Sequence, residues 1–403
     1  MPTPRRASAT TSEPAYLAKD VSGQVSPKSE IAALDILRCV AALCVVVYHF
    51  LYADWTEARG NGSIPDLVSR SLRFPEAVSL TWWGGIGVEI FFVISGFVIV
   101  MSAAKGTAAQ FALGRFKRLY PALLTFASLS CLTLILSGVL SPIEALERWA
   151  RALVLLPKGP WIDGAVWTLT VEIVFYLLIF LCLYLGKRDR LFTYARYALC
   201  ILFLFSAVVF VQAHHSLGTL GALSNRIAKA YFSRPLLLTT GSFFLVGVFG
   251  YEISAQGLNW QRALCASLAA LVSAYWIQFR ALSSTGVTEF GRSAYVPVIV
   301  WAGALTLCVA AMALERKIEL SAKTRQMARR IGLMTYPLYL INQIFGGWIL
   351  GRLCALGLNP WLSVALTIGL ICTISSLFAT YGEPRLRANL LSLPSRLAHF
   401  RQA

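Results

Sequence analysis

Residues 31–53 read IAALDILRCVAALCVVVYHFLYA, and the class of structure follows from this stretch. It exceeds the roughly 20 apolar residues that a helix needs to cross a hydrocarbon core about 30 Å thick. Runs of similar length recur along the chain, and we interpret each as a membrane span. Ten spans are expected, near 33–53, 86–104, 118–138, 165–185, 192–213, 236–254, 261–280, 294–314, 331–351 and 359–380. The predicted fold class is all-α, a polytopic membrane bundle of about ten transmembrane helices.

The overall composition agrees with a protein whose core lies in lipid. Hydrophobic residues make up 57% of the 403 positions and charged residues only 14%, against roughly a quarter charged in soluble domains. The net charge is +17, and the basic residues fall in the gaps between apolar runs, as the positive-inside rule describes. Membrane lipid is therefore an expected partner, and nucleic acid is not.

Three regions follow from this pattern. Residues 1–30 are polar and rich in Ser, Thr, Pro and Ala, which predicts a disordered cytoplasmic tail. Residues 31–384 form the membrane domain, and residues 385–403 form a C-terminal tail. The loops that share a side with the N-terminus carry most of the basic residues, so both termini are expected in the cytoplasm, with the chain in the plasma (inner) membrane. Segment 139–164 is predicted to include an interfacial helix.

The first predicted span carries ionisable residues that need an explanation. Each costs about 2.5–3.5 kcal/mol at the centre of a membrane helix. Arg38 and His49 are eleven positions apart, which places them on one helix face, about 17 Å apart along the axis. Asp35 lies one turn before Arg38 and can pair with it. A packing histidine beside an interfacial ion pair also explains these residues, but the shared face favours a functional site.

Two later spans carry buried carboxylates. Glu89 opens the second span, and Ser95 follows it beside Gly96, where a helix or ligand can approach closely. Glu172 lies about one turn into the fourth span, with Thr168 and Tyr176 one turn away on the same face. A carboxylate at such a position must face a partner or a water-filled cavity, or be protonated. Helix packing is the favoured explanation of Ser95.

Cations and cysteines give two further indications. Arg115 and Arg118, with a lysine between them, lie at the inner membrane edge, where they suit a phosphate-rich ligand or lipid headgroups. Positive-inside anchoring explains them equally well. The nine cysteines lie mostly inside apolar runs without a C-x-x-C pair, so we predict neither disulfides nor a metal. A histidine as base, with cations for phosphates, is a set that suits acyl transfer from a thioester.

These residues make the chain resemble the acyltransferase-3 family of membrane acyltransferases, which includes O-antigen, nodulation-factor and exopolysaccharide acetylases. The resemblance covers roughly residues 31 to 384, and its motifs occur in the family's order. They are Arg38 with ten residues before His49, Glu89 ahead of Phe91-Phe92 and Ser95-Gly96-Phe97, Arg115 and Arg118 before Pro121, and Trp167-Thr168-Leu169 before Glu172.

The resemblance implies a fold, a reaction and a set of residues. It implies about ten transmembrane helices, acetyl-CoA or another acyl-CoA as cytoplasmic co-substrate, and a hydroxyl of a carbohydrate or glycolipid as acceptor. His49 corresponds to the catalytic histidine, acting as a base or as a transient acyl carrier. The expected roles are catalysis for His49, Glu89 and Glu172, acyl-CoA binding for Arg38, Arg115 and Arg118, and substrate binding for Asp35, Ser95, Trp167 and Glu383.

One departure and two alternatives remain open. The family often has a histidine in the ninth span where this chain has Asn342, which puts a second proton-transfer histidine in doubt. A secondary transporter or flippase-like protein would use the intramembrane His, Glu and Arg as a proton or substrate pathway, but no internal repeat is visible. A structural or sensor protein leaves these residues unexplained. The tryptophans around Trp82-Trp83 and from Trp161 to Trp167 could stack on sugar rings, but interfacial anchoring is the favoured explanation.

Overall fold

The computed structural model describes residues 17–19, 25–27, 31–56, 72–215, 217–315 and 320–389. These ranges are almost entirely helices and short connections, apart from β1 (Leu17–Lys19) and β2 (Val25–Pro27), which pair antiparallel. The tails predicted at 1–30 and 385–403 lie largely outside the described residues, so their order and location stay predictions.

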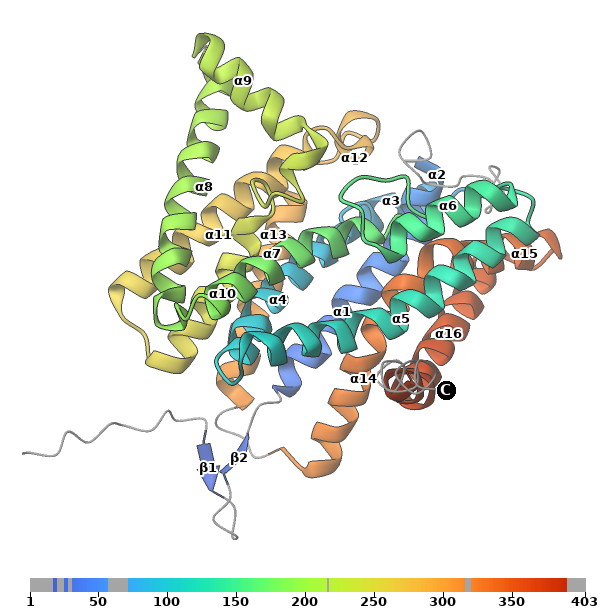
Figure 1. Ribbon diagram of the computed structural model, residues 1–403. Helices are drawn as coiled ribbons and strands as arrows, with labels where there is room; N and C mark the ends of the chain where they lie inside the picture. The colour runs from blue at the N-terminus through green and yellow to red at the C-terminus, as the bar shows by residue number, and fades with distance from the viewer. Residues whose placement is uncertain are drawn as a thin grey trace, which may run out of the picture.

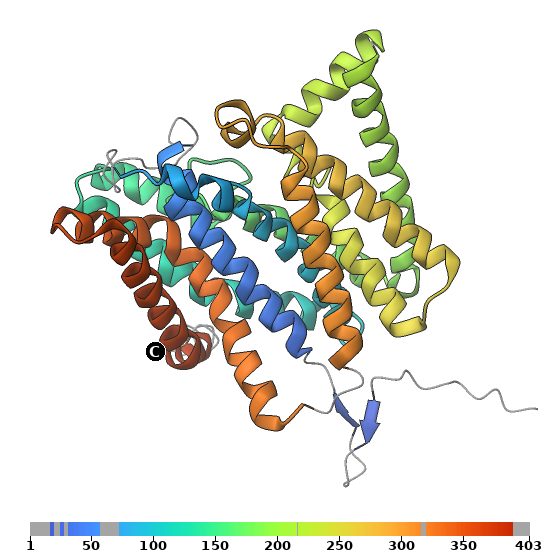
Figure 2. The same ribbon diagram turned by 180° about the vertical axis from the view of Figure 1, so that it is seen from behind.

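The long helices lie side by side in one bundle, and the short helices lie toward the end of the bundle that is uppermost in Figures 1 and 2. The long helices are α1 (Ala32–Tyr48), α4 (Gly87–Ala103), α5 (Ala108–Leu136), α7 (Val166–Tyr184), α8 (Leu191–His214), α10 (Gly241–Gln256), α11 (Trp260–Ala281), α13 (Val296–Glu315), α14 (Ala322–Ile341) and α16 (Pro360–Leu377). The shorter helices are α2 (Asp54–Thr56), α3 (Val78–Thr81), α6 (Pro142–Leu153), α9 (Gly218–Lys229), α12 (Thr285–Thr288) and α15 (Gly347–Ala355).

Three π-helical segments interrupt or end long helices. They are η1 (His49–Ala53) after α1, η6 (Asn342–Gly346) between α14 and α15, and η7 (Phe378–Gly382) after α16. Four short 3₁₀ segments complete the helices: η2 (Pro75–Ala77), η3 (Gly84–Ile86), η4 (Arg188–Arg190) and η5 (Tyr231–Ser233). Since π-helices are rare and occur often at functional sites, the ends of α1 and α14 are places to search for one.

Eight helical segments of the described chain are long and apolar enough to cross a membrane, which confirms an integral membrane helix bundle. Two predicted spans, 236–254 and 331–351, are not among the eight. The first corresponds to α10, which has only 16 residues. The second corresponds to the end of α14 with η6 and α15, where Pro337, Asn342 and Gln343 interrupt the apolar run. The predicted number of ten spans is thus approximate.

Helix α10 and the C-terminal half of α14 pack inside the bundle. Helix α14 lies against α1, and α10 lies against α4, α8 and α11. Polar residues are tolerated there because neighbouring helices rather than lipid surround them. The contact of α4 with α10 depends on Gly96 and Gly247, where an added Cβ would collide with backbone atoms of the facing helix. The small patch predicted at Ser95-Gly96 is therefore a real close approach of two helices.

A helix also occupies the segment in which an interfacial helix is predicted. Helix α6 starts after Ser141, whose hydroxyl accepts a hydrogen bond from the Glu144 backbone N–H at 3.3 Å. Its exposed face carries an ion pair of Glu144 with Arg148 at 2.6 Å, while Ala145 and Ala152 are buried. This amphipathic pattern fits a membrane surface, and the position at the interface stays a prediction.

Candidate functional site

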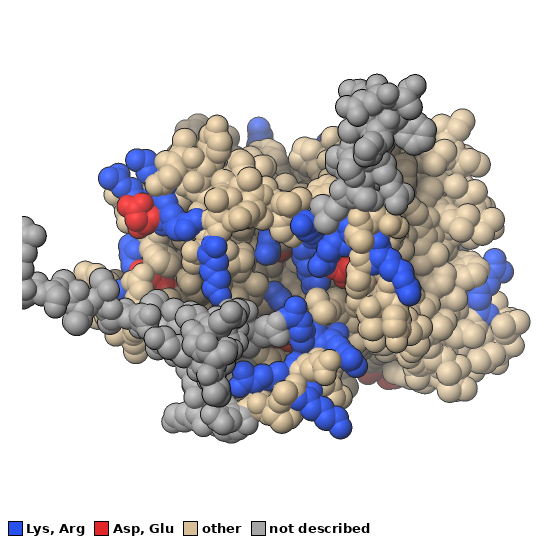
Figure 3. Space-filling view, turned by 60° about the horizontal axis from the view of Figure 1, so that its bottom comes forward, with Lys and Arg blue, Asp and Glu red and all other residues tan. Residues whose placement is uncertain are grey.

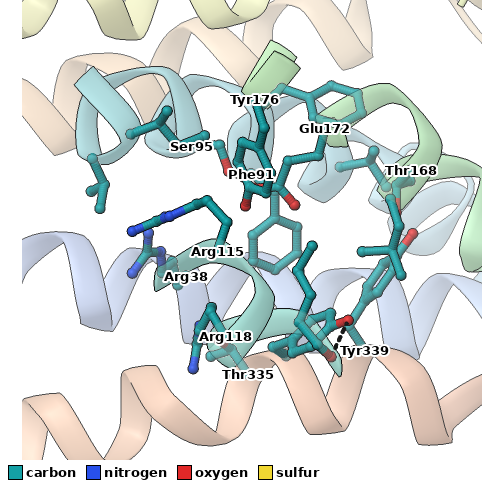
Figure 4. A pocket seen from close by; sticks show the side chains of 17 residues that line it. Arg38, Phe91, Ser95, Arg115, Arg118, Thr168, Glu172, Tyr176, Thr335 and Tyr339 are labelled. Atoms are coloured by element: carbon teal, nitrogen blue, oxygen red, sulfur yellow. Dashed lines mark hydrogen bonds between the residues drawn. The ribbon is translucent and has the colours of Figure 1, made fainter. Parts of the chain in front are cut away.

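One cavity lies between α1, α4, α5, α7 and α14, and three of its four charged side chains are arginines (Figure 4). Arg38 comes from α1, Arg115 and Arg118 come from α5, and Glu172 comes from α7. We call it the arginine cavity. Three of the residues that the sequence assigned to acyl-CoA thus share one cavity, although 77 positions separate Arg38 from Arg115.

Each of the three guanidinium groups contacts a neighbouring side chain that fixes its position. Arg38 lies 3.5 Å from the Asp35 carboxylate, and Arg118 lies 3.8 Å from the Glu383 carboxylate. The Arg115 guanidinium lies 5.6 Å from the centre of the Tyr176 ring, a cation–π distance. The Nε of Arg115 is buried without a hydrogen-bond partner among the described residues, and the Nη1 of Arg118 has no hydrogen bond there beyond its longer ion pair with Glu383. These cations therefore retain donors for an anionic ligand.

Glu172 lies with the arginines. Its Oε1 accepts a hydrogen bond from the Ser95 hydroxyl at 2.9 Å, and both side chains line the arginine cavity together with Thr168 and Tyr176. The predicted shared face of Thr168, Glu172 and Tyr176 is confirmed. The residues that line this cavity do not include His49, so Glu172 is better placed to balance the arginine charge than to exchange a proton with that imidazole.

A second, larger cavity of about 760 Å³ contains His49 and many aromatic side chains. We call it the aromatic cavity. Its rings are those of Trp82, Trp83, Trp161, Trp167 and Tyr231, together with Tyr48. Four of the tryptophans that the sequence left between anchoring and sugar stacking thus share one cavity. Its volume lies in the range of small-molecule sites.

His49 begins the π-helix η1 and is fixed by a polar partner from η6. Its Nδ1 lies 2.6 Å from the Asn342 Oδ1. The Asn342 Nδ2 donates to the backbone carbonyl oxygen of Tyr339 at 2.6 Å and to that of Leu338 at 3.3 Å. Asn342 therefore accepts a hydrogen bond from His49 at the position where the resemblance implies a histidine.

Glu89 also lines the aromatic cavity, but it is paired. Its carboxylate accepts a hydrogen bond from Arg280 at the end of α11, in an ion pair between partly buried side chains. The partner that the sequence analysis required for the buried Glu89 carboxylate is therefore a cation, Arg280. Trp167 lies in the same cavity, with the Arg234 guanidinium 5.4 Å from the centre of its ring.

The two cavities meet at a shared wall, because Val88 and Tyr339 line both of them. Arg38 and His49 lie on the same helix, about 17 Å apart by the α-helical rise of 1.5 Å per residue, and each opens to a different cavity. The common helix face predicted for Arg38 and His49 therefore connects two compartments rather than forming one cluster.

Two predicted substrate-binding residues line neither cavity. Asp35 packs beside Gly332 of α14 and pairs with Arg38. Glu383 follows η7, is buried, and pairs with both Arg118 and Arg387. The positions of Asp35 and Glu383 favour a role in orienting the arginines over direct contact with a substrate.

Sequence reasoning did not find several residues of these cavities. The sequence alone assigned no role to Arg280, Arg234 or Tyr339. The available signal for Tyr339 and Asn342 was the polar break in the ninth span. Within the described residues, no group of three or more His, Cys, Asp or Glu side chains is arranged to hold a metal ion.

Comparison with known proteins gives one match. A family model described as an acyltransferase domain, of the acyltransferase-3 type, matches residues 31–380 and so nearly the whole chain. The search of curated proteins and the search of solved structures each found no match.

Proposed function

Because this chain belongs to the acyltransferase-3 family of membrane acyltransferases, we propose that it transfers an acyl group from acyl-CoA to a hydroxyl of a glycan or glycolipid. Acetyl-CoA is the proposed donor in the first instance. The observation that carries the proposal is the pair of cavities: one lined by arginines, one by His49 and aromatic rings, with Val88 and Tyr339 between them.

The arginine cavity suits the phosphates of a donor. Arg115 and Arg118 have buried N–H groups without hydrogen-bond partners among the described residues, and phosphate oxygens are strong acceptors for such groups. Arg38 adds a third guanidinium from α1. In this proposal the phosphates bind at Arg115 and Arg118, and the thioester end reaches past Val88 and Tyr339 toward His49.

The aromatic cavity suits a carbohydrate acceptor. Sugar rings stack on indole faces, and the cavity gathers four tryptophans together with Tyr231. Glu89 and Arg280 supply polar groups that can hydrogen-bond sugar hydroxyls. A site of about 760 Å³ accommodates a sugar unit or a short glycan segment, while the rest of a polymer or lipid carrier extends outside.

His49 performs the proton transfer in this proposal. Its imidazole takes the proton of the acceptor hydroxyl while the hydroxyl oxygen attacks the thioester carbonyl carbon. The tetrahedral intermediate then expels the CoA thiolate as the C–S bond breaks, and the imidazolium returns its proton to that sulfur. A two-step route has the same balance: His49 first takes the acyl group from sulfur and then passes it to the hydroxyl.

The distribution of charge supports a cytoplasmic origin for the donor. Lys and Arg outnumber Asp and Glu on the face seen in Figure 3, the end of the bundle where α1 begins. Arg38 and the arginine cavity lie toward this end of α1, and His49 lies toward the other. With the basic face in the cytoplasm, both termini are cytoplasmic, the donor enters from inside, and the acceptor binds from the opposite side.

The test is transfer of radiolabelled acetyl from acetyl-CoA by the purified full-length chain in liposomes, with mixed glycans as acceptors. We expect label on glycan and release of free CoA from wild type, and neither from folded His49→Ala. Lys105→Gln, which alters an exposed residue after α4, should match wild type. Absence of transfer from a range of acyl-CoAs, combined with no CoA binding, contradicts the acyltransferase and favours a transporter.

A further inference from the structure

Asn342 is buried completely, with 0% of its surface exposed. Its amide group can take only one orientation there. The backbone carbonyl oxygens of Leu338 and Tyr339 accept hydrogen bonds and cannot donate them, so the Nδ2 amide must face them. The Oδ1 atom is thereby directed at His49, 2.6 Å from its Nδ1.

This orientation determines where the imidazole carries its proton. An amide oxygen only accepts, so the short contact requires a hydrogen on the His49 Nδ1. Neutral imidazole has a single N–H, and Nε2 is then left with the lone pair. Histidine free in water prefers the opposite arrangement, with the hydrogen on Nε2. The contact with Asn342 therefore selects the less common tautomer.

We propose that Asn342 is the positioning residue of this enzyme: it holds His49 as the Nδ1–H tautomer and so presents Nε2 to the reacting hydroxyl and thioester. The inference rests on the proposed function, because it names the atom with which His49 performs that reaction. Asn342 itself does not line either cavity, so it acts through His49 and not on a substrate.

The surrounding backbone holds His49 and Asn342 in position relative to each other. His49 is the first residue of η1 and Asn342 is the first residue of η6, so the two partners lie at the starts of two π-helical segments. On another side of η6, the buried Asp163 carboxylate accepts hydrogen bonds from the backbone N–H of Ile344 and from that of Ala165 at 2.8 Å. Asp163 thus links the loop before α7 to η6.

The chemistry expected of an amide differs from that of a carboxylate. A carboxylate beside Nδ1 would orient the ring and also stabilise the imidazolium by charge. An amide orients the ring and adds no charge, so His49 stays a neutral base or nucleophile. Partners that orient a metal-bound histidine through its other nitrogen affect activity by about 10- to 100-fold when removed, and we expect a loss of the same order for His49.

The first test compares acetyl transfer by three variants across a pH range. Asn342→Leu keeps the approximate volume but removes the acceptor, and kcat should fall about 10- to 100-fold with KM for acetyl-CoA unchanged. Asn342→Asp keeps the acceptor oxygen toward His49, but its other oxygen can donate to the Leu338 and Tyr339 carbonyls only while it is protonated. This variant should therefore retain more activity than Asn342→Leu at low pH and lose that advantage as the pH rises. Ser363→Ala, which changes another fully buried polar residue, should match wild type.

The second test reads the tautomer directly and needs no activity. The chain has four histidines, so replacing His214, His215 and His399 with Gln leaves His49 as the single ¹⁵N-histidine signal in an NMR spectrum. In this background the spectrum should show hydrogen on Nδ1, and adding Asn342→Leu should move it toward Nε2.

The outcomes separate the two proposals. If wild type transfers acetyl and Asn342→Leu equals it in kcat, or if the His49 tautomer does not respond to Asn342, the positioning role is wrong while the acyltransferase stands. If wild type transfers nothing, the proposed function fails, and the spectrum alone still decides whether Asn342 selects the tautomer. Should Asn342→Leu not fold, the pH profile of Asn342→Asp decides, and a profile equal to that of wild type overturns the inference.

Discussion

Arg115→Gln should weaken CoA binding strongly without affecting the chemical step. The Arg115 guanidinium is held against Tyr176, yet its buried Nε has no hydrogen-bond partner among the described residues. In the proposed complex it donates to a phosphate. A hydrogen bond to a charged group contributes about 1.5–3 kcal/mol, and 1.4 kcal/mol corresponds to a factor of ten. The dissociation constant of CoA should therefore rise about 10- to 150-fold.

The assay is equilibrium binding of radiolabelled CoA to detergent-solubilised protein, with S-acetylpantetheine as a phosphate-free competitor. Arg115→Gln should weaken binding of CoA and leave the affinity for S-acetylpantetheine unchanged. Lys105→Gln also removes one positive charge, just after the C-terminal end of α4. Because Lys105 is exposed, this substitution should change CoA binding by less than about two-fold in physiological salt. Unchanged CoA binding by Arg115→Gln, or an equal loss for both ligands, would refute the assignment of phosphates to this cavity.

Three further variants test the cavity charge, the helix packing and a buried acid. Glu172→Gln removes the carboxylate that faces the arginines, so CoA should bind tighter by on the order of 1 kcal/mol, and weaker binding would show that Glu172 orients them instead. Gly96→Ala places a Cβ against the Phe244 backbone and should lower the melting temperature in detergent by several degrees, whereas Gly114→Ala, where nothing lies within 4 Å, should not. Burial raises the pKa of Asp163 from 3.8 to about 7, so the folded state binds the extra proton and stability falls as pH rises between these values. Asp163→Asn should remove that pH dependence and stabilise the protein above pH 7 by up to about 4 kcal/mol, and a melting temperature with unchanged pH dependence would contradict this.

The sequence predicted the membrane bundle because lipid imposes a length and an apolar composition on each span. It did not predict that α10 and the C-terminal half of α14 lie inside the bundle, because that depends on which helices pack together. The polar residues Asn342 and Gln343 in the ninth predicted span reflect this enclosed position. A hydropathy pattern does not distinguish such a helix from a lipid-facing one with a local polar break.

The sequence predicted which residues belong to the candidate site, but not how these residues are arranged in space. Arg38 and His49 share a helix, and periodicity placed them on one face. Their separation into two cavities follows from Val88 and Tyr339 on other helices. The partner of His49 is 293 positions away, and no local spacing rule reaches that far. The π-helical starts at His49 and Asn342 are likewise a product of tertiary packing and leave no recognisable pattern in the sequence.

The most direct test is sided transfer in sealed proteoliposomes of one orientation, with [¹⁴C]acetyl-CoA supplied only to the basic face of Figure 3, where α1 begins. Wild type should label the glycan when the acceptor is present only on the opposite side, and folded His49→Ala should give no label. Label that requires donor and acceptor on the same side, or that persists without His49, would contradict the proposal that the donor reaches His49 past Val88 and Tyr339 from one face while the acceptor binds from the other.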